Sequence, residues 1–184
     1  MARRLTLIAS LALLAAAFAA APAEAMKIRN LMAPPSVCPG QNNSSAPVYK
    51  QERAMRCMTN YARRHAGSGG YARSAKLSSS ADRKGEDILR CDSFSHNACG
   101  RDFTFWLRRV DFIGGCWTAG ENIAWGSGPL GDARSVFRAW MHSSGHRQNI
   151  LSGDYSQLGV SLRVGTLDGT RGAHVWVQHF GDRC

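Results

Sequence analysis

Apolar side chains recur every three or four residues in four stretches of the chain, a pattern that predicts amphipathic α-helices. The first helix is expected between Pro47 and Gly67, because proline is favoured near a helix start and glycine just past its end. The second covers 77–89, with Ser79 and Asp82 as a variant of the capping box. Two shorter helices are expected at 103–110 and 133–141. The apolar stripes consist of Gln51, Ala54, Met55, Met58, Tyr61, Ala62 and His65; Leu77, Ala81, Ile88 and Leu89; Phe103, Trp106, Leu107 and Val110; and Ala133, Val136, Phe137, Trp140 and Met141.

The last third of the chain alternates apolar and polar residues, which is the period of a β-strand. Leu158, Val160, Leu162 and Val164 alternate with polar or small residues, and AHVWVQHF follows after a glycine-rich turn. We expect an antiparallel hairpin with one buried face. The segment GENIAWG, residues 120–126, predicts a further strand. Helices and strands are interleaved and the hairpin comes last, so the expected fold class is α+β, packed as a sandwich.

The N-terminal segment has the pattern of an export signal. Two arginines precede an apolar run from Leu5 to Ala21, and a small-residue A-x-A sequence ends at Ala25. Residues 1–25 are therefore expected to be a signal peptide, with an uncleaved membrane anchor as the alternative. Residues 26–47 are rich in proline, asparagine and serine, which predicts a linker or an N-terminal arm. Residues 48–184 are expected to form the single folded domain of a secreted protein.

Six cysteines lie beyond the predicted cleavage site, and an even number in an exported chain indicates disulfides. The pairing stays open, except that Cys184 is expected to tie the C-terminus to the body. Without the signal peptide, 21 basic and 12 acidic residues leave a net charge of +9. Such a surface is expected to attract anionic partners in a salt-dependent way, cell-wall polymers or lipid headgroups among them. Export and the lack of a basic-aromatic strip argue against nucleic acid.

Three side chains next to turn-forming residues are candidates for chemistry: His96, Glu121 and His146. Two imidazoles and a carboxylate suit a divalent metal such as zinc, and equally an acid/base group. His142 and His146 have the spacing of the H-E-x-x-H motif, but no glutamate follows His142, and Ser144 and Gly145 are expected to end the helix before His146. His142 falls on the polar side of its helix and is expected at the surface.

Glu121 is unusual because it interrupts a strand-like run. Along a strand it shares a face with Ile123 and Trp125, so its carboxylate is expected to point inward and to need imidazole or cationic partners. A solvated strand edge is the alternative. Disulfides of the neighbouring cysteines are expected to stiffen the loops next to His96 and Glu121. His65 lies on the apolar side of the first helix and is expected to be a core histidine.

Several linked motifs in this order resemble the CAP superfamily, also called the SCP-like extracellular domain, in its bacterial branch. They are GENIAWG, then AWMHSSGHRQNILSGDYSQLGVSL, then VWVQHFG, and the resemblance covers about residues 48 to 181. It implies a three-layer α-β-α sandwich with a mostly antiparallel sheet. It also implies an open cavity where His96, Glu121 and His146 meet. In many eukaryotic relatives a second glutamate occupies the position of Ser143. The resemblance therefore implies that this chain has a triad instead of four residues, as other bacterial members do.

The resemblance implies a secreted ligand-binding module, with lipid or a divalent metal as possible ligands, acting as a monomer. Two alternatives stay open. One is a metal-dependent hydrolase, with His96 and His146 on the metal and Glu121 as ligand or general base. The other is a cell-wall-associated structural protein held by its basic surface. The sequence contains no G-x-S-x-G motif, and its cysteines are expected to be oxidised. These two observations argue against an enzyme.

Overall fold

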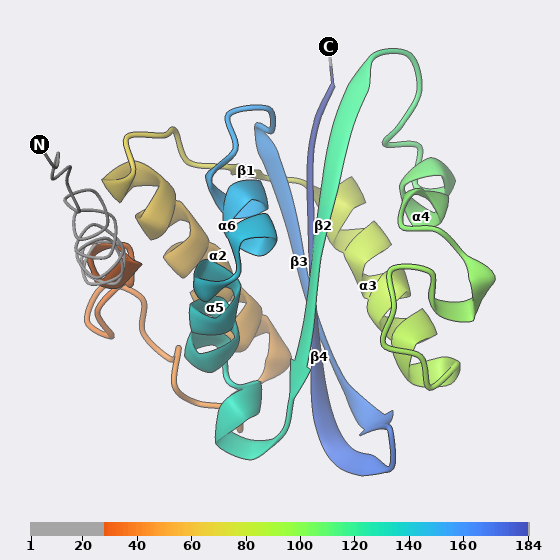
Figure 1. Cartoon of the computed structure of the whole chain (residues 1–184), viewed down its shortest axis with the longest axis horizontal. Coiled ribbons are helices and arrows are strands. Elements are labelled where there is room, and N and C mark those ends of the chain that lie inside the picture. Colours follow the sequence, from red (N-terminus) through yellow and green to blue (C-terminus); the bar gives the residue numbers. More distant parts are fainter. Residues whose placement is uncertain (1–27, 184) are drawn as a thin grey trace, which may run out of the picture.

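A four-stranded sheet lies between two layers of helices, as Figure 1 shows with the sheet seen nearly edge-on. The computed structural model describes residues 28–183, so the predicted signal peptide and Cys184 lie outside the described residues. The strands are β1 (Ala72–Arg73), β2 (Trp117–Gly126), β3 (Gln157–Leu167) and β4 (Thr170–Arg183), in the order β1-β3-β4-β2. The predicted α-β-α sandwich is confirmed.

The sheet is mostly antiparallel, as predicted, but its edge pairing makes it mixed. β3 and β4 form the predicted hairpin, and β4 also pairs antiparallel with β2 along ten residue pairs. The short β1 pairs with β3 in parallel. In the β2–β4 register Glu121 lies directly opposite His179. Because β2 is an edge strand, side chains from either helical layer can approach each other across it.

One face of the sheet packs against α2 (Val48–His65), α5 (Ala133–His142) and α6 (Ser144–Leu151). The apolar stripes predicted for the first and fourth helices enter this core, where Met55, Phe137 and Trp140 meet Leu162 and Trp176. All five predicted stripe residues of α5 are buried. The hydrophobic periodicity therefore identified the faces of α2 and α5 that drive the packing.

The other face is covered by α3 (Ala75–Arg90), with α4 (Thr104–Arg109) beside it. Ile88 of α3 packs on Ile123 of β2 and on alternate residues of β4, including Val175 and Val177. The expectation that the hairpin has one buried face is therefore wrong. Residues 158–162 and 173–181 are buried throughout, because a helical layer covers each side of the sheet. Gly159 permits the close approach: a Cβ there would lie 2.1 Å from a backbone atom of α3.

Two local expectations are corrected by the structure. The start of α3 is capped by Ser74, whose Oγ accepts a hydrogen bond from the Leu77 amide, so Ser79 lies inside the helix and caps nothing. His65 is exposed and stacks on Tyr61 with ring centroids 3.8 Å apart. It lies in the last turn of α2, beyond the edge of the core, where the apolar side of a helix has nothing to cover it.

Residues 28–47 pack along α2 and α5. A disulfide joins Cys38 to Cys57 of α2, and the Arg134 amide of α5 donates to the Gln41 carbonyl. Cys38 is fully buried. Between the helices and strands lie two short 3₁₀ turns, Ala98–Gly100 and Gly128–Gly131. Within residues 28–183, no helix is long and apolar enough to cross a membrane.

Candidate functional site

Glu121 is the centre of a buried polar cluster on the edge strand β2. Its side chain is only 2% exposed. Oε1 accepts a hydrogen bond from Nδ1 of His96 at 2.5 Å, and Oε2 accepts one from Nε2 of His179 at 2.8 Å. The carboxylate therefore points inward and is paired with imidazoles, as expected. A solvated strand edge does not describe this residue.

The backbone around Glu121 is fixed by groups from α6 and from the loop after it. Asn149 of α6 donates through Nδ2 to the Glu121 carbonyl and to Oδ1 of Asn122. A Cβ at position 120 would lie 2.6 Å from the Tyr155 hydroxyl. Glycine before the glutamate thus lets α6 and Tyr155 close over the strand, which holds the carboxylate in one orientation.

His179 is a partner of Glu121 that sequence analysis missed. It is fully buried on β4, and its Nδ1 lies 2.7 Å from Oγ of Ser80 on α3. Ser80 also donates to the Leu77 carbonyl. A buried imidazole with both nitrogens engaged fixes the second oxygen of Glu121 and connects the sheet to α3. The available signal was its position opposite Glu121, but the pairing of two strand residues 58 positions apart is not readable from sequence.

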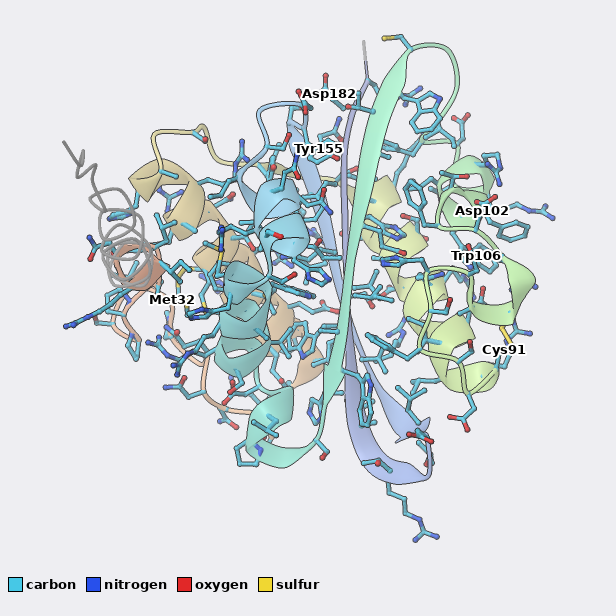
Figure 2. All side chains as sticks on the ribbon, viewed as in Figure 1. Met32, Cys91, Asp102, Trp106, Tyr155 and Asp182 are labelled. Carbon is cyan, nitrogen blue, oxygen red and sulfur yellow. A yellow bond between two sulfur atoms is a disulfide. The ribbon has the colours of Figure 1, made fainter. Side chains whose placement is uncertain are left out.

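His96 reaches the site from the loop between α3 and α4. The Cys91–Cys99 disulfide closes this loop, and the Lys84 ammonium of α3 donates to the His96 carbonyl. Figure 2 shows the Cys91 disulfide at the end of α3. The His96 side chain is 56% exposed. Its Nδ1–H is held by Glu121, so Nε2 is the ring nitrogen that could bind a cation. The expected disulfide next to His96 is confirmed.

His146 approaches from the opposite helical layer. α5 ends at His142, as expected, but a new helix, α6, begins at Ser144 and contains His146. Nδ1 of His146 lies 2.8 Å from Oγ of Ser143, the predicted fourth position. Asn122 donates to the His146 carbonyl. His142 is exposed, as predicted.

The charges in this cluster are strongly coupled. Burial would raise the pKa of Glu121, but hydrogen bonds from His179 and His96, with the positive charge of Lys84, lower it to about 2. The Lys84 pKa is itself lowered, mainly by burial. Burial also lowers the pKa of His146, and electrostatic repulsion from His96 lowers it further. Glu121 is therefore ionised and His146 uncharged at neutral pH.

The three predicted residues do not form a three-ligand metal site. Within residues 28–183, no group of three or more His, Cys, Asp or Glu side chains is arranged to hold a metal ion. Both carboxylate oxygens of Glu121 are hydrogen-bonded to imidazoles, so this residue orients His96. His96 and His146 remain as the candidate metal ligands. Each is anchored through Nδ1, which leaves Nε2 of both available, and imidazole is a common ligand of zinc.

Comparisons with known proteins agree with this fold. The YkwD protein of Bacillus subtilis, itself uncharacterized, is 31% identical over 139 residues, which is 74% of this chain and 50% of the relative. The chain thus matches only half the length of that relative.

Three solved structures share the fold at 16–23% identity. An extracellular SCP-domain protein of Bacillus anthracis aligns with a TM-score of 0.58 over 76% of this chain and 45% of its own. A cysteine-rich secretory protein of Staphylococcus aureus gives 0.57 over 76% and 40%. An outer surface protein of Borrelia burgdorferi gives 0.60 over 73% and 94%. A profile of the cysteine-rich secretory protein family, CAP, matches residues 56–180, and the chain belongs to this family.

Proposed function

We propose that this protein is an exported binding module whose His96–Glu121–His146 site binds a divalent transition metal such as zinc. The observation that carries the proposal is the hydrogen bond between Nδ1 of His96 and Glu121. A carboxylate that accepts from one ring nitrogen fixes the tautomer, so that the other nitrogen carries the lone pair. Metal-binding histidines are commonly oriented in this way.

Two imidazoles and no protein carboxylate define an open site. His96 and His146 supply the protein ligands, and water or an extracellular ligand completes the coordination. The lowered pKa of His146 supports this role, because an uncharged imidazole can bind a cation at neutral pH. Glu121, ionised and enclosed, contributes a negative charge next to His96. Its charge offsets part of the positive charge that a metal ion would bring to a basic protein.

Export is part of the proposal. The described chain has disulfides that join Cys38 to Cys57 and Cys91 to Cys99, which form and persist in oxidising compartments. Two of the solved relatives are described as an extracellular protein and an outer surface protein. The signal-like pattern of residues 1–25 agrees with both observations.

Titration calorimetry with zinc chloride tests the metal site. We expect one zinc ion to bind the wild-type protein, and His96→Ala or His146→Ala to abolish the binding heat. His142→Ala is the matched control, because this exposed histidine at the end of α5 is only four residues from His146 and is expected to leave binding unchanged. Equal zinc binding by all four proteins, or no binding by the wild type, would overturn the proposal.

A further inference from the structure

A second feature is a basic groove beside α2, next to the edge strand β1. One part of it is a hollow of about 400 Å³ lined by Arg53, Arg56 and Arg64 of α2 and by Arg73 of β1. The α2 residues are spaced by three and eight positions, so they lie on one face of the helix, opposite its buried stripe. No acidic side chain lines this hollow.

The four arginines are not neutralised by close ion pairs among residues 28–183. None forms an ion pair there. The negative charge of Glu52 acts on Arg56, but the Glu52 carboxylate accepts a hydrogen bond from the Leu162 amide at 3.1 Å. Arg56 is only partly exposed, and its pKa is lowered by burial and by the positive charge of Arg73. Partly buried cations that repel one another are stabilised by an anionic ligand.

The walls of the hollow are held in place by hydrogen bonds. Asn60 of α2 pairs with both backbone groups of Tyr71: its Nδ2 donates to the carbonyl at 3.1 Å and its Oδ1 accepts from the amide at 2.8 Å. Arg63 donates to the Gly69 carbonyl and covers the Tyr71 ring at 3.5 Å. The segment that carries Arg73 is thus fixed against α2. Arg73 and Arg56 both line the hollow, and the backbone that carries them is held without a ligand.

The groove continues beyond this hollow toward the start of α2. A second hollow, of about 710 Å³, shares Arg53 and Cys57 with the first and adds Lys50 and the exposed Tyr49. From Lys50 to Arg64 the helix rises about 21 Å at 1.5 Å per residue. A ligand with one phosphate would fill only part of that length. Five positively charged side chains line the groove: Lys50, Arg53, Arg56 and Arg64 of α2, and Arg73 of β1. This arrangement suits a linear ligand with repeated negative charges.

From this groove we infer a second binding site, independent of the metal site, for a linear phosphodiester polymer. Guanidinium groups bind phosphate in a bidentate way. The oxygens of a tetrahedral phosphate diverge, so Arg56 from the helix and Arg73 from the strand can contact one phosphate together. Nucleobases would gain little binding energy from stacking in the hollow lined by the four arginines. Its one aromatic side chain, Tyr71, is 5% exposed and covered by Arg63.

The test compares two double variants of equal charge. Arg56→Gln with Arg73→Gln changes the groove. Arg109→Gln with Arg171→Gln removes the same charge from exposed positions on α4 and at the start of β4. Binding of soluble poly(glycerol phosphate) is measured at several salt concentrations. We expect the groove variant to bind about tenfold more weakly, with a salt slope smaller by roughly one per lost phosphate contact. The control variant is expected to bind within about twofold of wild type.

Binding of three other phosphate-containing ligands shows which kind of phosphate the groove prefers. Inorganic phosphate is expected to bind at least tenfold more weakly than the polymer. Vesicles of phosphatidylglycerol test a membrane surface, and a single-stranded oligodeoxynucleotide of equal charge tests nucleic acid. Equal weakening in both double variants would show a general effect of net charge and overturn the inference. Tighter binding to vesicles or to the oligonucleotide than to the polymer would overturn it as well. Near-ultraviolet circular dichroism confirms that both variants are folded.

Discussion

Replacement of Glu121 with glutamine tests how the site is held together. The pKa of Glu121 is about 2 in the folded protein and its ordinary value is 4.5. Since the side chain is 2% exposed, little screening by water applies. A pKa difference of about 2.5 corresponds to about 3 kcal/mol of folding stability that only the ionised form supplies. Because the folded pKa is the lower one, this stability is present above about pH 4.5 and is lost as the pH falls toward 2.

The assay is urea unfolding, followed by tryptophan fluorescence, for wild type and Glu121→Gln between pH 2 and 6. We expect the glutamine variant to be about 3 kcal/mol less stable at pH 6, with the difference shrinking steadily below pH 4.5. Glu86→Gln on α3 is the control: its exposed carboxylate forms surface ion pairs, and we expect a loss below about 1 kcal/mol. A stability difference between wild type and Glu121→Gln that is the same at every pH would refute the assigned ionisation.

Two further predictions concern the loop that carries His96 and the packing of α3. Joint replacement of Cys91 and Cys99 with serine is expected to lower stability by about 2–3 kcal/mol and to weaken zinc binding, and an unchanged melting temperature would contradict this. Gly159→Ala would place a Cβ 2.1 Å from the Leu77 carbonyl carbon, so we expect a loss of about 3 kcal/mol or more in the same urea assay. A variant as stable as wild type would show that α3 does not approach β3 so closely.

The elements of the fold were largely predictable because burial and periodicity go together. The stripe of α5 and the alternation in β3 each follow one face toward the core, and both were identified. The start of α3 was misplaced because its first turn carries few apolar side chains, and Ser74 was not recognised as its cap. The second covered face of the hairpin was missed because residues such as Ser161 are polar yet buried beneath α3.

The candidate site was predictable in its residues but not in its connections. Glu121 was singled out because a carboxylate in a strand needs partners, and the structure supplies two. One of them, His179, was not predicted, since only the strand register places it opposite Glu121. With His179 on one oxygen and His96 on the other, both oxygens of Glu121 are engaged, which changes its proposed role from metal ligand to orienting group. No hydrophobic pattern contains this information.

Anomalous diffraction at the zinc absorption edge, from crystals soaked in zinc chloride, tests the central claim most directly. We predict one strong peak about 2.0–2.1 Å from Nε2 of both His96 and His146, with Glu121 still hydrogen-bonded to Nδ1 of His96. The claim would be contradicted by crystals with no peak between these imidazoles, or by a peak bonded to the Glu121 carboxylate in place of His96.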